Sequence, residues 1–317
     1  MADDKSKFRI AVVGIGGVGG FVGGKLAARF ENSEIVEVIL AARGKNEKAI
    51  RANGLKLIAT EGEQIVKPKL IATEEIGNTN LLLLCTKEYD LEETISSLKK
   101  FIGEKTVILP LLNGVDTAER IAGILPDAEI WQGCIYVASR LTKPGVVQEM
   151  GNICLIYFGD GKARSEKTEF VETVFREAGI DAHFAEDILA KIWEKFVFIS
   201  ALAASTSYFN ATIRGVLDNQ EYKNLFDNLL AEIKLVAAAK RIGISEEEIQ
   251  QKLDKLHELP PEVTSSMHTD FSSGKRAELN SLVGYVVEQA KKLNVPTPAY
   301  EKVYGELAKK QKLAAGG

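Results

Sequence analysis

Residues 8–19 read FRIAVVGIGGVG, and this stretch decides the fold of the first half of the chain. The near-continuous apolar run Phe8–Val13 is typical of a parallel strand that is buried on both faces. Glycines follow it directly and open a helix-like segment over residues 21–30. In the pattern Gly14-x-Gly16-x-x-Gly19, the first glycine permits a tight turn and the second lets the backbone approach a pyrophosphate. The third lets the helix pack against the strand.

This strand–turn–helix context predicts a dinucleotide-binding loop, because the unpaired N–H groups at the helix start face the diphosphate. The alternative is a glycine-rich turn without a ligand. The residues that we expect to contact the cofactor are Gly14, Ile15, Gly16, Gly17, Val18 and Gly19.

Further apolar runs and helical patterns alternate up to about residue 187. Buried strands are predicted over residues 35–41, 81–86 and 106–112, with a helix over 90–101, and residues 129–159 read as strands joined by turns. Repeated strand–helix–strand order predicts an α/β fold with a Rossmann-type, doubly wound parallel sheet.

After residue 187 the strand signals nearly vanish. Helices are predicted over residues 188–209, 220–241, 246–257, 276–293 and 300–312. We therefore expect a dinucleotide-binding domain over residues 1–187 and an all-α substrate and catalytic domain over residues 188–317.

The composition is that of an ordinary soluble globular protein. Of the 317 residues, 45% are hydrophobic and 26% are charged, and the formal net charge is −4, which does not favour nucleic acid or anionic membrane as partners. The polar start Met1–Lys7 lacks the apolar core of a signal peptide, and no apolar stretch approaches the ~20 residues that span a bilayer. Three cysteines without metal-ligand spacing and three histidines predict a cytoplasmic protein without a metal site.

The end of the second strand favours NADP over NAD. NAD-binding sites usually carry Asp or Glu there, which accepts a hydrogen bond from the ribose 2′-hydroxyl. This chain has Ala41-Ala42-Arg43-Gly44-Lys45 instead. Arg43 could pair with a 2′-phosphate through its planar guanidinium. The alternative is a pair of solvated surface cations.

Two polar residues follow the ends of other strands. Lys87 comes after the strand over 81–86, and Asn113 comes after the strand over 106–112. Open α/β sheets bind ligands beyond the carboxyl ends of their strands, so both are candidates for cofactor binding. Either residue could instead be a solvated loop residue.

Lys195 lies in the apolar centre of the long helix 188–209, where the polar stripe of that helix ends. Burial lowers the pKa of a lysine, which suits a proton donor to the oxygen of a ketone that is being reduced. The alternative is a lysine whose stem covers apolar surface at a contact of the helix. Glu278 reads either as a catalytic group or as a first-turn glutamate, Ser266 as a turn or cap residue, and the three histidines as structural or surface residues.

The chain resembles the ketopantoate reductase (2-dehydropantoate 2-reductase) family over nearly its whole length. The motifs that carry the resemblance are the Gly14–Gly19 loop, Cys85-Thr86-Lys87, Leu112-Asn113-Gly114-Val115, Pro144-Gly145-Val146-Val147, Trp193-x-Lys195, Ser265-Ser266-Met267-x-x-Asp270, Ala277-Glu278-Leu279 and Pro296-x-Pro298. The resemblance implies NADPH-dependent reduction of ketopantoate to pantoate in pantothenate biosynthesis.

The resemblance also implies roles for single residues. Lys195 would be the general acid, Glu278 would orient the lysine and the substrate, and Ser266 would hold polar groups of the substrate. Asn113 would contact the substrate and the lysine. On the cofactor side, Arg43 would bind the adenosine 2′-phosphate and Lys87 would lie beside the ribose.

Two positions depart from the family pattern. Ile199 stands where family members commonly have an Asn one helical turn after the lysine, and Arg214 stands where a further Asn is expected. Since a hydroxyl binder contributes much of a site's discrimination, these changes leave three hypotheses open. They are ketopantoate reductase, a paralogous reductase of another 2-keto acid or imine, and a non-catalytic NADPH-binding regulator. The oligomeric state is left open, with a homodimer as one alternative.

Overall fold

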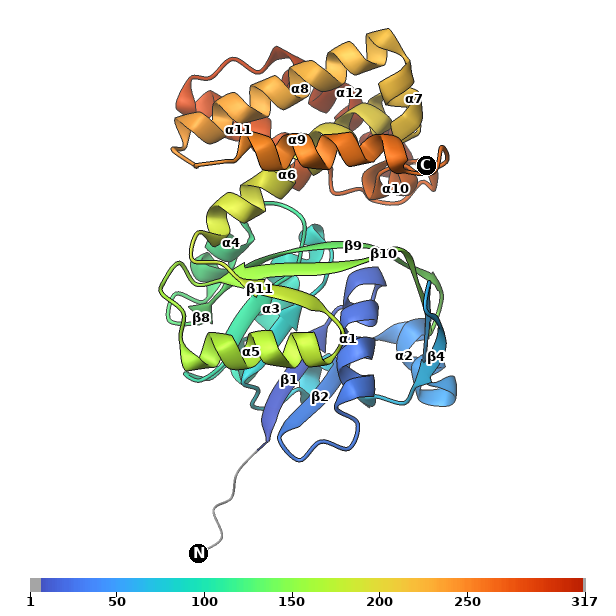
Figure 1. Cartoon of the computed structure of the whole chain (residues 1–317), viewed down its shortest axis with the longest axis vertical. Helices are drawn as coiled ribbons and strands as arrows, with labels where there is room; N and C mark the ends of the chain where they lie inside the picture. The colour runs from blue at the N-terminus through green and yellow to red at the C-terminus, as the bar shows by residue number, and fades with distance from the viewer. Residues whose placement is uncertain (1–6, 316–317) are drawn as a thin grey trace, which may run out of the picture. The chain divides into compact units, whose positions relative to one another are not determined.

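The apolar run that precedes the glycines forms strand β1 (Phe8–Val13), which lies in the middle of a six-stranded sheet in the computed structural model (Figure 1). The strand order of this first sheet is β5-β2-β1-β6-β7-β8, and all neighbours run parallel. This is the order of a Rossmann-type sheet, so the predicted fold class is confirmed. The other strands are β2 (Val36–Ala41), β5 (Lys69–Ile71), β6 (Leu81–Leu84), β7 (Val107–Pro110) and β8 (Glu129–Ile130).

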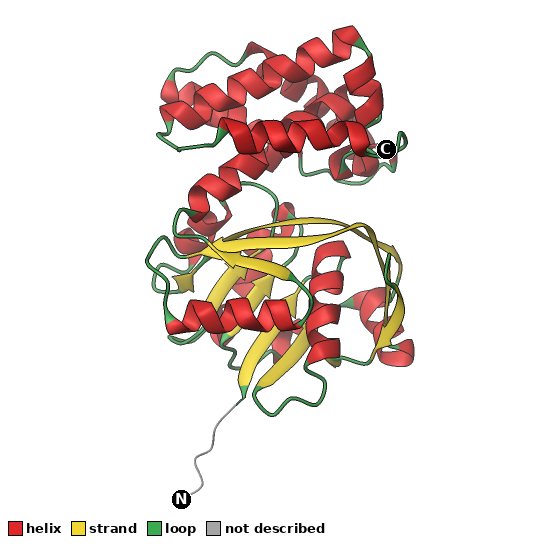
Figure 2. Cartoon of the chain, in the orientation of Figure 1, coloured by secondary structure: helices red, strands yellow, loops and turns green. Residues whose placement is uncertain are grey.

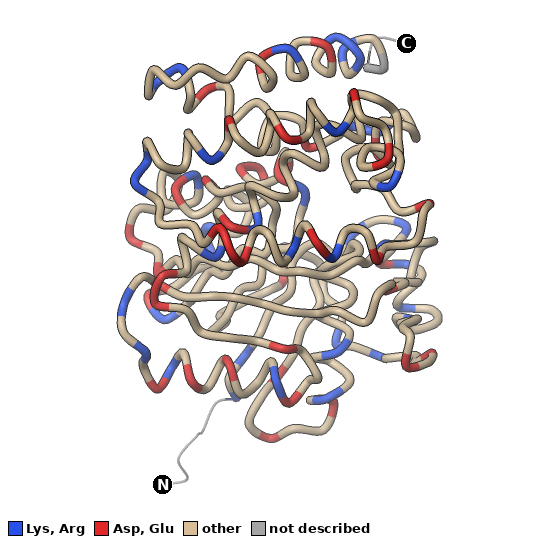
Figure 3. Tube along the Cα trace, turned by 45° about the horizontal axis from the view of Figure 1, so that its top comes forward, with Lys and Arg blue, Asp and Glu red and all other residues tan. Residues whose placement is uncertain are grey.

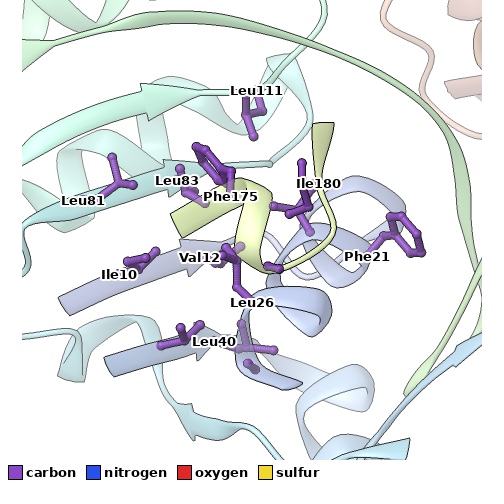
Figure 4. Close-up of a cluster of buried hydrophobic side chains, with 14 of the residues drawn as sticks. Ile10, Val12, Phe21, Leu26, Leu40, Leu81, Leu83, Leu111, Phe175 and Ile180 are labelled. Carbon is purple, nitrogen blue, oxygen red and sulfur yellow. The ribbon is translucent and has the colours of Figure 1, made fainter. Parts of the chain in front are cut away.

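The central strands are largely apolar because both of their faces are covered. Ile10 and Val12 of β1 belong to one hydrophobic cluster, whereas Ala11 and Val13 belong to another. Figure 4 shows part of the first cluster, in which Val12 lies beside Leu26 from helix α1 (Gly17–Arg29). The second cluster is closed on the opposite face by α3 (Leu91–Leu98) and α4 (Thr117–Ile124).

A second sheet completes this part of the chain. Its strand order is β11-β10-β3-β4, and β9 pairs with β10 in an antiparallel hairpin. These strands are β3 (Leu55–Ala59), β4 (Gly62–Val66), β9 (Gln132–Lys143), β10 (Val146–Gly159) and β11 (Asp181–Phe184). Helix α2 (Gly44–Asn53) precedes β3, and α5 (Glu166–Glu177) packs its Phe175 into the first cluster.

From residue 189 onward the described chain is helical, as predicted (Figure 2). The helices are α6 (Ile188–Phe209), α7 (Ile213–Asp218), α8 (Gln220–Ala239), α9 (Glu246–Asp254), α10 (Ser266–Ser272), α11 (Tyr285–Leu293) and α12 (Pro298–Ala315). A separate core, which includes Trp193, Phe196 and Tyr300, holds them together. The bounds of α6 are those expected from its apolar pattern.

The structure describes residues 7–315, so the polar residues 1–6 used for the signal-peptide prediction lie outside it. The described chain divides into unit 1 (residues 7–112 and 116–188) and unit 2 (residues 113–115 and 189–315). Cationic and anionic residues are interspersed along both units (Figure 3). In the described part of the chain no helix is both long and apolar enough to cross a membrane.

Candidate active site

The glycine-rich loop links β1 to α1 through a tight turn. Gly14 has a φ of +91°, which L side chains rarely adopt, and its carbonyl accepts a hydrogen bond from Gly16 N at 2.9 Å. Helical bonding then begins where Gly20 N donates to Gly16 O at 3.0 Å. The side chain of Ile15 is buried and that of Val18 packs against the core, so these two residues offer a ligand only their backbone.

The glycines of this loop differ in what surrounds them. A Cβ on Gly14 would lie 2.7 Å from the backbone of Cys85, one on Gly17 would lie 2.4 Å from Ser139 O, and one on Gly19 would lie 2.2 Å from Gly14 O. A Cβ on Gly16, by contrast, would meet no atom within 4 Å. Three glycines therefore let the protein pack against itself, whereas Gly16 keeps open space in front of the backbone. That space fits the approach of a pyrophosphate.

Three strand ends lie beside one another at this edge of the first sheet. In the parallel register Val13 of β1 pairs with Ala41 of β2 on one side and with Leu84 of β6 on the other. The residues that follow these strands therefore share the carboxyl edge with Gly14. This is where open α/β sheets place their ligands.

Beyond β2 the chain presents Arg43 to solvent. Arg43 precedes α2 in extended conformation, its side chain is 75% exposed, and its Nη2 lies 3.5 Å from Asp90 Oδ2. An exposed pair at that distance is weak, so the guanidinium can turn to an anion. Lys45 is also exposed, in the first turn of α2.

Beyond β6 the chain places Lys87, half-buried, immediately before a 3-10 turn, Glu88–Asp90. The preceding residue, Thr86, was not predicted as a site residue, yet its Oγ1 is buried without a hydrogen-bond partner. Burial raises the pKa of the Cys85 thiol to about 12, so this cysteine stays a neutral packing residue. In the sequence, the Cys85-Thr86-Lys87 motif is the one feature that could have indicated Thr86 as a site residue.

Lys195 lies in the middle of α6 and is 7% exposed. Its Nζ donates a hydrogen bond to Asn113 Oδ1 at 2.9 Å, in the same unit. Asn113 follows β7 in the chain, but residues 113–115 group with the helices rather than with the sheet. The structure thus joins two of the predicted site residues, 82 positions apart.

The polar neighbours of Lys195 on α6 have separate partners. Lys191 pairs with Glu194 at 3.3 Å and also with Glu248 of α9, and Glu194 accepts a hydrogen bond from Ser245 N at 3.2 Å. Burial raises the pKa of Glu194, whereas hydrogen bonds from Glu194 and Lys191 lower the pKa of Glu248 to about 2. This cluster fastens α6 to α9.

Glu278 is 5% exposed and stands immediately before a helix, rather than inside one as predicted. The helix expected from about residue 276 starts with a π-helical turn, Asn280–Gly284, and continues as α11. Before this helix, Lys275 N donates to Asp270 O at 2.9 Å and Ala277 N donates to Gln311 Oε1 at 3.2 Å. Single π-turns occur frequently at functional sites.

Ser266 is the exposed first residue of α10. The cap of that helix is its neighbour Ser265, whose Oγ accepts from His268 N at 3.1 Å and lies 2.7 Å from Thr206 Oγ1. Ser265 therefore takes the capping role, and Ser266 is left exposed beside it.

Ile199 and Arg214, which depart from the family pattern, both lie in the helical unit. Ile199 is half-buried, one turn after Lys195 on α6. Its neighbour Ser200 cannot replace an amide there, because its Oγ is fully buried, donates to Leu282 O at 2.6 Å and lies 2.7 Å from the Tyr300 hydroxyl. Arg214 donates from Nη2 to His257 O at 2.5 Å.

No cluster of three or more His, Cys, Asp or Glu side chains able to hold a metal ion occurs among residues 7–315. The arrangement of the described groups suits anion binding at the glycine loop, where Gly16 leaves open space, and proton transfer from the buried Lys195.

Comparison with known proteins places the chain in a family. Residues 10–163 match ketopantoate reductase PanE/ApbA, and residues 187–311 match the C-terminal part of the same family. A 2-dehydropantoate 2-reductase of Pyrococcus horikoshii is 27% identical over 97% of this chain and 99% of its own length. YkpB, an uncharacterized oxidoreductase of Bacillus subtilis, is 26% identical over 94% of this chain and 97% of its own length.

Solved structures agree. The crystal structure of 2-dehydropantoate 2-reductase from Porphyromonas gingivalis is 34% identical, has a TM-score of 0.83, and covers 96% of this chain and 100% of that one. A dimeric ketopantoate reductase of Staphylococcus aureus has the same fold, with 19% identity, a TM-score of 0.80, and coverage of 96% of this chain and 99% of that one. The chain belongs to the ketopantoate reductase family of oxidoreductases.

Proposed function

We propose that the protein reduces 2-dehydropantoate to pantoate with NADPH, as a step of pantothenate biosynthesis in the cytoplasm. The observation that carries this proposal is the buried Lys195, hydrogen-bonded to Asn113 at 2.9 Å, in a family of oxidoreductases. A buried ammonium group with an amide acceptor is a ready proton donor for a ketone oxygen.

The glycine loop and its neighbours would hold the cofactor. The open space at Gly16 fits the pyrophosphate, and the partnerless Thr86 Oγ1 offers a polar group at the same edge. Arg43 would bind the adenosine 2′-phosphate and Lys87 would lie beside the ribose. NADPH, when bound, supplies the hydride. We assign this role to residues 1–187, and substrate binding and catalysis to residues 188–317.

Lys195 would deliver its proton to the carbonyl oxygen as that oxygen gains negative charge. The ketone thereby gains a hydrogen at carbon and one at oxygen, which balances reduction to the alcohol. Asn113 would fix the position of the ammonium group, since its Oδ1 accepts from Nζ, and it would contact the substrate. Glu278 would orient the lysine and the substrate, and Ser266 would bind polar substrate groups with its exposed hydroxyl.

Ile199 favours a second candidate, a reductase of a 2-keto acid with an apolar side chain. The half-buried side chain of Ile199 lies one turn from Lys195. The hydroxyl of Ser200 beside it already forms hydrogen bonds with Leu282 O and the Tyr300 hydroxyl. The site would then discriminate by apolar contact, which is worth only about 1–3 kcal/mol per methylene.

A steady-state assay of NADPH oxidation distinguishes the candidates. We expect the highest kcat/KM with ketopantoate, lower values with 2-ketoisovalerate and pyruvate, and weak activity with NADH. A higher kcat/KM with 2-ketoisovalerate than with ketopantoate would favour the second candidate, a reductase of a 2-keto acid with an apolar side chain. Absence of turnover with every keto acid, with NADPH still bound, would contradict both.

We propose further that the protein assembles as a homodimer, as the related S. aureus enzyme does. Light scattering coupled to gel filtration should give twice the chain mass of 34.6 kDa, and a mass equal to one chain would contradict the proposal.

A further inference from the structure

Asn46, in the first turn of α2, bridges two segments that are far from it in the sequence. Its Nδ2 donates to Ile15 O in the glycine loop at 2.5 Å, and its Oδ1 accepts from Gly145 N at 2.7 Å. The orientation of the amide is fixed, because a backbone carbonyl can only accept and a backbone N–H can only donate. Both ends of this side chain are therefore used.

The Pro144-Gly145 turn, which joins β9 to β10, packs closely against α2. Gly145 has a φ of +76°, and a Cβ there would lie 3.2 Å from Ala49 Cβ of α2. Its carbonyl accepts from Lys56 N of β3 at 2.8 Å. The same hairpin lies against the glycine loop, since a Cβ on Gly17 would lie 2.4 Å from Ser139 O of β9. Asn46 thus joins α2, the hairpin and the glycine loop.

The two ends of the cofactor site differ in how firmly they are held. The glycine loop is fixed by its internal Gly16 N–Gly14 O bond and by the close packing of Gly14 and Gly19. The start of α2 lacks a side-chain cap, and Gly44 there has a φ of +65°. Arg43 lies three residues before Asn46, at this less constrained end.

We propose that Asn46 is a positioning residue for NADP selectivity: it sets the distance between the glycine loop and Arg43. The inference rests on the proposed cofactor function and extends it. Without the bridge the loop keeps its shape, but α2 no longer presents Arg43 at a fixed distance from the pyrophosphate. The loss of affinity should therefore come from the contact between Arg43 and the 2′-phosphate, a group that NADPH has and NADH lacks.

The test compares the dissociation constants of NADPH and NADH by fluorescence titration. For Asn46→Ala we expect the Kd of NADPH to rise roughly 5- to 30-fold, the range for losing two hydrogen bonds. The Kd of NADH should change less than about 3-fold, within the scatter of a neutral change. Asn53→Ala is the matched control, because Asn53 is exposed on the same helix and donates only within it, to Ala49 O at 3.4 Å. Asn46→Ser, with a hydroxyl too short to bridge both partners, replaces the alanine variant if that variant does not fold.

A double-variant cycle with Arg43→Ala separates the possible results. If Asn46 acts through Arg43, then Asn46→Ala should weaken NADPH no further in the Arg43→Ala background. Equal losses for NADPH and NADH, or additive losses in the double variant, would overturn the inference while leaving the proposed cofactor intact. If Arg43→Ala alone leaves NADPH binding unchanged relative to the helix control Arg51→Ala, the proposed NADP site itself is wrong and the inference fails with it.

Discussion

Lys195 Nζ and Asn113 Oδ1 lie 2.9 Å apart, although one residue belongs to the long helix α6 and the other lies three residues after the end of strand β7 of the parallel sheet. Residues 113–115 group with the helical unit, so the amide reaches Lys195 as part of the same packed core. A nearly buried ammonium group requires such an acceptor, because an unpaired buried charge is strongly destabilising.

Replacing Lys195 by alanine should abolish proton donation and leave cofactor binding intact. We expect kcat to fall roughly 10²- to 10⁴-fold, the range for losing a general acid. The Kd of NADPH, measured by fluorescence titration, should stay within about threefold. Lys191→Ala is the control on the same helix, since Lys191 pairs with Glu194 and Glu248, and it should keep its kcat. Unchanged turnover in Lys195→Ala would show that Lys195 is not the general acid, and absence of turnover in the unsubstituted protein would favour the non-catalytic regulator.

Asn113 allows the charge state of Lys195 to be tested without removing the lysine. In Asn113→Asp the acceptor oxygen is kept and a negative charge is added, which favours the protonated ammonium. The basic limb of the pH profile of kcat should therefore move to higher pH, whereas Asn113→Ala should lower kcat without that upward movement. A profile of Asn113→Asp that is unshifted or moved to lower pH would show that this contact does not govern the proton donor.

Gly16 distinguishes a ligand-binding loop from a merely tight turn. An alanine Cβ at this position would meet no protein atom within 4 Å, so Gly16→Ala should fold with its stability changed by no more than about 1 kcal/mol. Because the methyl group would occupy the space assigned to the pyrophosphate, NADPH and NADH should both bind at least about tenfold more weakly. Gly123→Ala, at another position with open space, should affect neither cofactor. Normal cofactor binding by a folded Gly16→Ala protein would show that the loop is a tight turn that does not bind the pyrophosphate.

The cluster of Lys191, Glu194 and Glu248 predicts how stability depends on pH. The pKa of Glu248 is lowered to about 2 from an ordinary value of 4.5, so its contribution is present above pH 4.5 and is lost as the pH falls toward 2. Glu248→Gln should destabilise the protein at neutral pH by on the order of 1 kcal/mol, since solvent screens a half-exposed carboxylate.

Urea unfolding at several pH values checks this. The difference between Glu248→Gln and the unsubstituted protein should shrink from pH 5 toward pH 3. The control is Glu247→Gln, an exposed neighbour in the same first turn of α9, which should show no such trend. If the difference in the free energy of unfolding stayed constant across that range, the ionised carboxylate of Glu248 would not be the source of the stabilisation.

Local sequence patterns were sufficient for strands β1, β2, β6 and β7 of the parallel sheet and for the long helix, whereas β5 was not predicted. The apolar run Phe8–Val13 gave β1, and the apolar centre of residues 188–209 gave α6 with its observed bounds. Both depend on burial along a continuous segment, which hydrophobic periodicity reports directly.

Features that depend on distant partners were not predictable in the same way. The pairing of Leu57 in β3 with Val147 in β10 and the bridge from Asn46 to Gly145 each join segments about 90–100 residues apart. The hydrogen bond from Ala277 N to Gln311 Oε1 likewise joins residues that are 34 positions apart. Position alone could not tell Ser265 from Ser266 as the capping serine, and the Ser265 hydroxyl also lies 2.7 Å from Thr206 Oγ1, 59 positions away.

The most direct test of the central claim follows the hydride itself. The protein is incubated with ketopantoate and NADPH that carries deuterium at both C4 positions, and the pantoate is analysed by mass spectrometry. The account predicts pantoate with one deuterium at C2 and a proton from Lys195 or solvent at oxygen. Unlabelled pantoate, or no pantoate from a protein that binds NADPH, would contradict it.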